Sequence, residues 1–383
     1  MFNHHDITRD ACMLHGPLAH HGYDWWWHSF TAQDMATGED KPFFIEFFVC
    51  NPALAEEEPV LGQLPANKEM GKKPSYLMVK AGTWGADACQ LHRFFAWKDV
   101  DLHATAPYRI EAADCLASET RLEGSIHITP AEALDHPEWM CDSGELSWDL
   151  TVDKQIAFNV GYGASKALRD AEAFAMYWHA EGMKSAYSGA VTFNGRRYAV
   201  TPNRSWGYAD KNWGRDFTSP WVWLSSNCLW SRKTGLQLYN SVFDIGGGRP
   251  KIYFLPLDRR LLGAFYYEGE EFEFNFSKPW TRTKTRFSAK ETDTEVFWAV
   301  GQESSDGAMI TKVRCKKSDM LLINYEAPDG SKRHNRLWNG GNGLGEITLY
   351  RRNGGRLYLL DRIRADHIGC EYGEYCAEPV LPE

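Results

Sequence analysis

Short segments in which hydrophobic and polar positions alternate follow one another through most of the chain, separated by turn-forming residues. Alternation with a period of two is typical of β-strands whose two faces meet different surroundings. The pair Asn194-Gly195, between two such segments, is typical of a tight hairpin turn. Helical signals are confined to 129–136 and 165–172. The pattern therefore predicts an all-β protein, built as an antiparallel barrel or sandwich.

The stretch 205–230 combines two kinds of segment that ordinary cores rarely place together. Its first part, SWGYADKNWG, crowds ionisable and aromatic residues between Gly207 and Gly214. Its second part, from 221 to 230, has the pattern of a strand that is covered on both faces. Because neighbouring residues of a strand point to opposite faces, Asp210 and Lys211 need not pair with each other. An acid and an amine therefore lie beside an aromatic strand.

Two interpretations of this stretch remain open at the level of sequence. In the structural one, Asp210 and Lys211 belong to a polar cluster within a tryptophan-rich core. In the catalytic one, an apolar cavity raises the pKa of the Asp210 carboxyl, so that it holds a proton near neutral pH and can donate it. Tyr208 or His179 could relay that proton, although His179 has an equally good interpretation as a structural histidine. Glu346 is a candidate second acid if its strand lines the same barrel.

The motif YADKNWG, with Trp178 and His179 upstream in MYWHAEG, resembles the central signature of the tocopherol cyclase-like proteins. Carotenoid hydratases and Diels–Alder cyclases are related to that family and share its fold. The equivalent motif reads Glu-Lys-Asn-Trp-Gly in the cyclases and Asp-His-Asn-Trp-Gly in the hydratases, and the form found here is intermediate. The resemblance covers residues 176–230, and the aromatic segment at 22–30 loosely resembles the family's opening.

This resemblance implies two tandem lipocalin-like antiparallel β-barrel domains, for which we expect ranges of 1–165 and 166–383, the second carrying the motif. A single large sandwich is the alternative. The resemblance and the local chemistry together predict a catalytic set and a substrate-binding set. The catalytic set is Asp210, Lys211, Tyr208 and His179. The substrate-binding set is Trp178, Trp206, Asn212, Trp213, Trp221, Trp223 and Asn227.

The composition of the chain limits the classes of molecule that it is expected to bind. A formal net charge of -9 argues against nucleic acid, because phosphate binding needs a concentrated basic surface. No apolar run approaches the roughly 18 residues that a spanning helix needs. The start of the sequence lacks a signal-like pattern, so we expect a cytoplasmic protein with no integral membrane segment. The 16 tryptophans offer flat apolar faces suited to a small hydrophobic molecule.

Cofactor motifs are missing from the sequence. There is no glycine-rich fingerprint between a strand and a helix, no phosphate loop and no zinc-ligand spacing. The neighbouring histidines at 4–5 and 20–21 lack further ligands at metal-binding spacing. We therefore expect neither a cofactor nor a metal. The oligomeric state is left open.

These observations predict a cofactor-independent acid/base enzyme acting on a small hydrophobic, conjugated or prenylated substrate. Protonation of an alkene would lead to cyclisation, hydration or double-bond isomerisation, which share one cationic intermediate. The alternative is a non-catalytic lipocalin-like protein that binds a hydrophobic ligand. Buried charge contributes little to purely apolar binding, which favours the enzyme. Carbohydrate cleavage ranks last, since no pair of carboxylates is identifiable from spacing.

Overall fold

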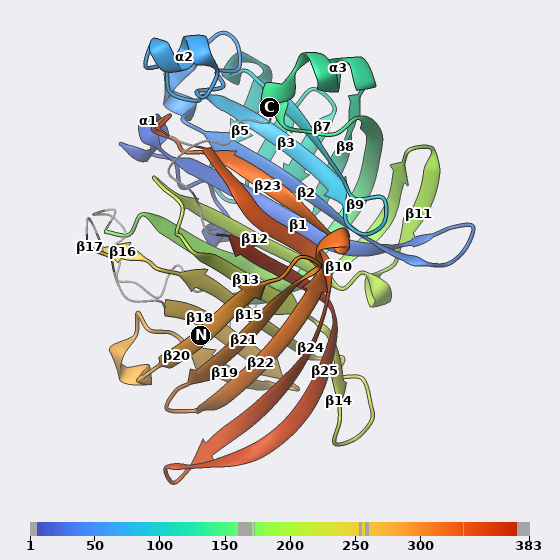
Figure 1. The fold of residues 1–383 in the computed structure, drawn as a ribbon, viewed down its shortest axis with the longest axis vertical. Helices are drawn as coiled ribbons and strands as arrows, with labels where there is room; N and C mark the ends of the chain where they lie inside the picture. Colours follow the sequence, from blue (N-terminus) through green and yellow to red (C-terminus); the bar gives the residue numbers. More distant parts are fainter. Residues whose placement is uncertain are drawn as a thin grey trace.

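Two large antiparallel sheets form the molecule in a computed structural model that describes residues 6–159, 171, 173–252, 255–256, 260–331 and 333–373 (Figure 1). The first sheet has the strand order β4-β3-β2-β1-β11-β10-β9-β8-β7-β6-β5, and β12 pairs with β1 and β10. Its strands are β1 (Tyr23–Asp34), β2 (Asp40–Cys50), β3 (Tyr76–Thr83), β4 (Cys89–Phe95), β5 (Val100–His103), β6 (Arg109–Ala112), β7 (Cys115–Ser118), β8 (Arg121–Ile128), β9 (Gly144–Phe158), β10 (Met176–Phe193), β11 (Arg196–Val200) and β12 (Gly207–Gly214).

The second sheet has the order β19-β18-β15-β13-β25-β24-β22-β21-β20, with β14 beside β25 and β23 beside β24. Its strands are β13 (Trp221–Ser226), β14 (Cys228–Ser231), β15 (Ser241–Gly248), β18 (Arg260–Tyr267), β19 (Glu270–Phe274), β20 (Lys284–Glu291), β21 (Glu295–Glu303), β22 (Gly307–Lys316), β23 (Met320–Glu326), β24 (Arg333–Asn353) and β25 (Arg356–Gly373). A small ribbon pairs β16 (Lys251–Ile252) with β17 (Leu255–Pro256), and the short helices are α1 (Leu18–His21), α2 (Pro65–Glu69) and α3 (Pro130–Asp135).

Each sheet curls into a barrel. In the first, β4 comes close to β8 and β9, so that opposite parts of the sheet meet. In the second, β20 approaches β18. The side chains of Thr285 on β20 and Gln302 on β21 donate hydrogen bonds of 3.3 Å and 3.2 Å to the carbonyl of Leu261 on β18, which links the two ends of the sheet. The predicted fold class, all-β with two antiparallel barrels in tandem, is confirmed.

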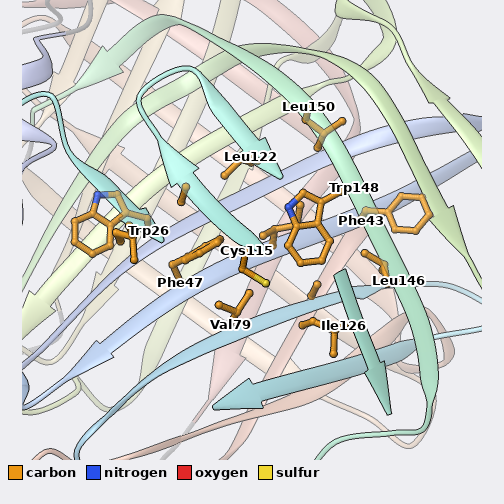
Figure 2. Packing of buried hydrophobic residues seen from close by; sticks show 14 of the residues in the cluster. Trp26, Phe43, Phe47, Val79, Cys115, Leu122, Ile126, Leu146, Trp148 and Leu150 are labelled. Carbon is orange, nitrogen blue, oxygen red and sulfur yellow. The ribbon is translucent and has the colours of Figure 1, made fainter. Parts of the chain in front are cut away.

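Among the described residues, buried hydrophobic side chains form three clusters. One lies inside the first barrel (Figure 2), one inside the second, and the third joins residues of both sheets. The alternation along β1 shows how one strand serves two of them. Trp26 belongs to the interior of the first barrel, while Trp25 and Trp27 belong to the shared cluster. β1 and β12 are therefore covered on both faces, as continuous burial along these strands requires.

The chain passes from the first sheet to the second between Gly214, the end of β12, and Trp221, the start of β13. The strands β10, β11 and β12 belong to the first sheet because they pair with β9 and β1. The domain boundary expected at residues 165 and 166 lies outside the described residues, as does most of the helix expected at 165–172. The other expected helix is confirmed as α3, which begins with a capping box between Thr129 and Glu132. The hairpin turn at Asn194-Gly195 is also confirmed. No helix among the described residues is long and apolar enough to cross a bilayer.

Candidate active site

Strand β12 carries the central motif and lies between β1 and β10. Alternation along it sends Tyr208, Asp210 and Asn212 toward the second barrel, and sends Lys211 and Trp213 into the first. The chemistry of the motif is therefore divided between two separate environments. Only the environment of Tyr208, Asp210 and Asn212 lies where the two barrels meet.

Asp210 is held by three aromatic hydrogen-bond donors. The indole N–H of Trp178 donates to Oδ2 at 2.8 Å, and the hydroxyl of Tyr208 donates to the same oxygen at 3.0 Å. The indole N–H of Trp25 lies 3.4 Å from Oδ1. These donors come from β10, β12 and β1, so strand pairing sets the orientation of the carboxyl. Only 7% of the Asp210 surface is exposed.

Burial raises the pKa of Asp210 to about 7. The hydrogen bonds from Trp178, Tyr208 and Trp25 stabilise the carboxylate and lower the pKa, while the nearby charge of Glu371 raises it. Desolvation is the largest of these effects. The outcome is a carboxyl group that is protonated in a substantial fraction of molecules at neutral pH and can both donate and accept a proton.

Asp244, on β15, is a second carboxyl beside Tyr208. The indole N–H of Trp223 lies 3.1 Å from the Tyr208 hydroxyl and 3.2 Å from Oδ1 of Asp244. Asp244 is fully buried, and burial together with the charge of Asp210 raises its pKa well above the ordinary range. Tyr208 and Trp223 therefore connect two carboxyl groups that belong to different barrels.

Glu371, on β25, is the third carboxyl of this region. It accepts hydrogen bonds from the Trp221 indole at 2.5 Å and from the Asn339 amide at 2.6 Å. Burial raises its pKa to about 7. Trp221 and Trp178 also line a cavity of about 80 Å³, together with Phe174, Met176, Tyr177, Thr218, Gly247, Gly248, Pro250, Arg260, Leu262, Phe276 and Ser277. Two walls of this apolar cavity are thus indoles whose N–H groups hold buried carboxyls.

Lys211 lies on the opposite face of β12. Its ammonium contacts both oxygens of Asp24, at 2.6 Å and 2.8 Å, and both side chains are fully buried. The same ammonium lies 4.6 Å from the ring centroid of Trp26 and 4.9 Å from that of Trp213. The structure therefore separates Lys211 and Trp213 from Asp210 and places them inside the first barrel.

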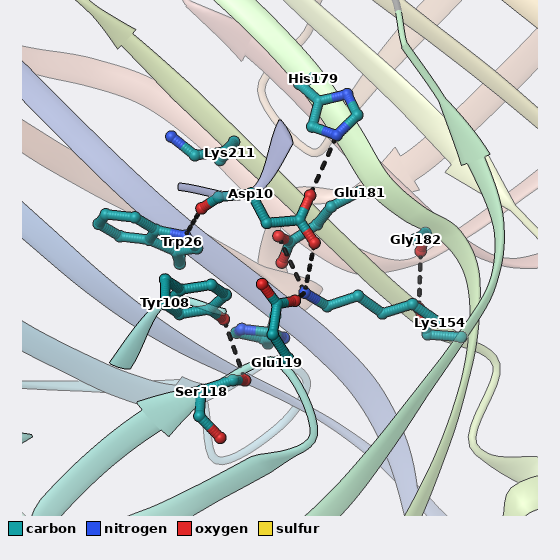
Figure 3. A network of polar contacts seen from close by, with 12 residues as sticks. Asp10, Trp26, Tyr108, Ser118, Glu119, Lys154, His179, Glu181, Gly182 and Lys211 are labelled. Atoms are coloured by element: carbon teal, nitrogen blue, oxygen red, sulfur yellow. Dashed lines mark hydrogen bonds and ion pairs between the residues drawn. The ribbon is translucent and has the colours of Figure 1, made fainter. Parts of the chain in front are cut away.

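His179 also faces the interior of the first barrel, in the polar network of Figure 3. Its Nε2 lies 3.2 Å from Oδ1 of Asp10, and burial lowers its pKa. In the same network, Lys154 lies 2.9 to 3.0 Å from oxygens of Asp10, Glu119 and Glu181. His179 is thus grouped with the Lys154 network, and not with the Asp210 carboxyl.

Three predicted residues remain, Asn212, Trp206 and Asn227, and none of them contacts the Asp210 carboxyl through a hydrogen bond described for this structure. Asn212 shares the face of Asp210 and accepts a 2.7 Å hydrogen bond from the Tyr23 hydroxyl. Asn227 donates to the carbonyl of Gly207, and Trp206 stacks on His367 with ring centroids 5.9 Å apart. Both line a separate pocket near the start of β12. The suggestion that Glu346 is a second acid is wrong, because this residue is exposed and pairs with Arg232 on the outer surface.

The predicted set thus contributes Asp210, Tyr208, Trp178, Trp223 and Trp221 to one region. Asn212 shares the face of Asp210, and the rest lie elsewhere. Reasoning from the sequence missed Asp244 and Glu371. Asp244 is the one carboxyl of its strand, SVFDIGGG, and Glu371 is the one carboxyl of HIGCEYG, the last seven residues of β25. The signal available in the sequence was a carboxyl residue among mostly apolar neighbours, because an isolated charge is costly to bury. Among the described residues, no group of three or more His, Cys, Asp or Glu side chains is placed to hold a metal ion.

Comparison with known proteins adds a family match. A family model described as tocopherol cyclase-like matches residues 145–371, a range that contains Asp210, Asp244 and Glu371. None of the curated proteins is detectably similar in sequence. Among solved structures, kievitone hydratase from Nectria haematococca is 11% identical, with 97% of each chain covered and a TM-score of 0.45. CghA, solved with Sch210972, is 11% identical, with 93% of this chain and 89% of that chain covered and a TM-score of 0.40.

Proposed function

This chain belongs to the tocopherol cyclase-like family, and from that premise we propose that it is a cofactor-independent acid/base enzyme in which Asp210 donates a proton to a small hydrophobic substrate. The substrate class is conjugated or prenylated, and the reaction is a cyclisation, a hydration or a double-bond isomerisation. The observation that carries the proposal is the Asp210 carboxyl itself, buried among aromatic donors with a pKa of about 7.

The chemistry follows from the surroundings of this carboxyl. Protonated Asp210 transfers its proton to a carbon of an alkene, which leaves a carbocation and a carboxylate. The N–H of Trp178 and the hydroxyl of Tyr208 stabilise that carboxylate. The faces of nearby indoles stabilise the cation, an interaction worth up to about 2 kcal/mol when desolvated.

Three outcomes then regenerate the acid. Attack by a hydroxyl of the substrate closes a ring, attack by water hydrates the alkene, and loss of a proton from a neighbouring carbon moves the double bond. In each case the attacking hydroxyl, the water or the neighbouring carbon loses one proton, and that proton returns to the Asp210 carboxylate directly or through the Tyr208 hydroxyl bonded to it. Proton transfer from a carboxylic acid requires no cofactor, which is why the proposal includes none.

The test is the substitution Asp210→Asn, which keeps the shape of the side chain and removes its ionisable proton. We expect turnover of prenylated phenols or polyenes to fall by roughly 10²–10⁴, with unchanged circular dichroism. Reaction in deuterated water should place deuterium on a carbon of the product when that hydrogen is retained. The control is Asp101→Asn, which alters an exposed carboxyl on β5 and should leave turnover unchanged.

An Asp210→Asn variant that turns over at the rate of the unsubstituted protein would overturn the assignment. Binding of the same molecules without turnover by any variant would favour a lipocalin-like protein that holds a hydrophobic ligand.

A further inference from the structure

A polar pocket of about 250 Å³ near the start of β12 is lined by residues of both barrels. Gln155 of β9 and Lys184 of β10 come from the first barrel. Asn227, between β13 and β14, and Tyr239, between β14 and β15, come from the second. The ammonium of Lys184 joins the two sides, because it donates a 2.7 Å hydrogen bond to the carbonyl of Tyr239. Asp210 does not line this pocket, so its chemistry is separate from that of the candidate acid.

Four side-chain carboxamides line the pocket, from Gln155, Asn203, Asn227 and Gln237. Each carboxamide offers two N–H donors and an acceptor oxygen. Asn227 donates to the carbonyl of Gly207 at 2.8 Å, and its Oδ1 accepts no hydrogen bond from the described residues. The side chains of Asn203 and Gln237 make no hydrogen bond within the described part of the chain. The pocket therefore presents donors and acceptors that the described protein groups leave unused.

Two aromatic side chains, Trp206 and Tyr239, line the same pocket. Tyr239 is 72% exposed, so its ring is open to a ligand. Trp206 has a backbone φ of 44°, a conformation that is uncommon for a bulky residue. Its ring stacks on His367 with centroids 5.9 Å apart, which fixes the orientation of the indole. Strained backbone of this kind is concentrated at sites that hold ligands, and here it holds a tryptophan at the pocket.

We propose that this pocket binds a saccharide, with the carboxamides contacting the hydroxyl groups of a pyranose ring and Trp206 and Tyr239 contacting its C–H groups. Hydroxyl groups both donate and accept hydrogen bonds, and so do carboxamides. The C–H groups of a pyranose carry a small positive charge, which suits the negative face of an aromatic ring. A cavity of about 150 Å³ accommodates benzene. The larger volume of this pocket leaves room for one six-membered ring with its substituents.

The charge of the lining favours a neutral ligand that is bound and not cleaved. Among the described lining residues Lys184 is the one cation, and its ammonium already contacts the Tyr239 carbonyl. Phosphate and carboxylate groups are better matched by the planar fork of arginine, which this lining lacks in the described part of the chain. No carboxyl group of the described residues lines the pocket, and hydrolysis of a glycosidic bond ordinarily uses a pair of them.

Simple glycosides test the proposal on the intact protein. The probes are the methyl pyranosides of glucose, galactose and mannose, and binding is measured by saturation-transfer NMR and isothermal titration calorimetry. At least one of them should bind with a dissociation constant of about 1 mM or lower. Cyclohexanol, which has a ring of the same size and a single hydroxyl group, should bind roughly tenfold more weakly, because it leaves the carboxamides without partners. Absence of binding by all three pyranosides, or equal binding of cyclohexanol, would overturn the proposal.

Two substitutions locate the binding site. Gln237→Met removes a carboxamide of the lining, and Tyr239→Ala removes an exposed ring. Each should weaken binding of the pyranoside by roughly threefold to tenfold, the range for one neutral hydrogen bond or one aromatic contact. Thermal unfolding should be unchanged, because neither side chain makes a hydrogen bond within the described part of the chain. Tyr358→Ala, which removes an exposed ring from β25, is the matched control and should leave binding unchanged. Pyranoside binding that neither Gln237→Met nor Tyr239→Ala weakens lies elsewhere and contradicts the proposal.

A free saccharide and the glycosyl group of a larger hydrophobic molecule present the same ring to this pocket. The phenyl glycoside of the sugar that binds distinguishes these two sources. Affinity equal to that of the methyl glycoside identifies a free saccharide, and binding roughly tenfold tighter identifies a glycosylated hydrophobic molecule, because burial of the phenyl ring then adds to the affinity. Both results support the site. Asp210→Asn should bind the pyranoside as the unsubstituted protein does, so failure of the proposed acid role and failure of the saccharide site are distinguishable.

Discussion

The indole N–H of Trp178 donates a 2.8 Å hydrogen bond to Oδ2 of Asp210. The two residues lie on neighbouring strands, and both side chains are buried. This bond lowers the pKa of Asp210, and burial raises it by more, to about 7. The balance between the two effects leaves the carboxyl able to exchange a proton at neutral pH, so a change in either effect should alter the pH dependence of turnover.

Trp178→Phe should move the loss of activity at high pH toward still higher pH. It removes a donor that stabilises the carboxylate, so the pKa of Asp210 rises further, by roughly one to two units for a hydrogen bond to a charged group. The measurement is kcat/KM as a function of pH. The matched control is Trp148→Phe, which replaces a buried indole in the interior of the first barrel and should leave the pH profile unchanged. If the pH dependence of kcat/KM is the same for Trp178→Phe and the unsubstituted protein, the hydrogen bond from Trp178 does not set the pKa of the group that controls turnover.

The contribution of Asp210 to stability should fall as pH rises from about 4 to about 7. The pKa of Asp210 is raised from 3.8 to about 7 by folding, so the folded state binds more protons than the unfolded state in this range. The stabilisation from this group is complete below its unfolded pKa and is lost as pH passes its folded pKa. Urea unfolding at several pH values should give a smaller slope for Asp210→Asn than for the unsubstituted protein. Equal slopes would show that Asp210 is not protonated by burial.

Lys211→Met should lower stability more than it lowers turnover. It leaves Asp24 buried without its partner, and breaking a buried ion pair in this way costs about 3–5 kcal/mol. The double substitution Asp24→Asn with Lys211→Met should recover part of that loss. Turnover per folded molecule should stay within several-fold, since Lys211 faces away from Asp210. Normal stability with a large loss of turnover would instead assign Lys211 a catalytic role.

Gly246→Ala should disturb the position of Trp178. A Cβ atom at Gly246 would lie 2.9 Å from Cζ3 of the Trp178 ring, which is closer than real contacts allow. We expect a loss of about 1–3 kcal/mol in the free energy of unfolding from overpacking. The pH profile of turnover should shift in the same direction as for Trp178→Phe. Gly301→Ala is the matched control, because a Cβ there meets its nearest neighbouring atom at 4.0 Å.

The strands, the turns and the presence of a carboxyl among aromatic residues were accessible from sequence. Alternation with a period of two, the Asn194-Gly195 turn and the capped helix near Thr129 depend on local chemistry, and the structure confirms all three. The separation of Asp210 from Lys211 follows from the same rule, since adjacent strand residues face opposite ways. Sequence reasoning nevertheless grouped these two residues, and His179 with them, in one catalytic set.

Strand pairing across the whole fold decided the rest. Asp244 lies on a strand of the second barrel, and only the packing of that barrel against β12 brings it to Tyr208. Lys80 is distant from Asp210 in the sequence, and the register of four neighbouring strands places both residues on the same face of the first sheet. The sequence by itself determined that this protein is made of strands and contains an acid among aromatic residues. Which side chains surround Asp210 at the buried interface between the two barrels depends on the pairing register of strands far apart in the sequence, and no local pattern predicts that register.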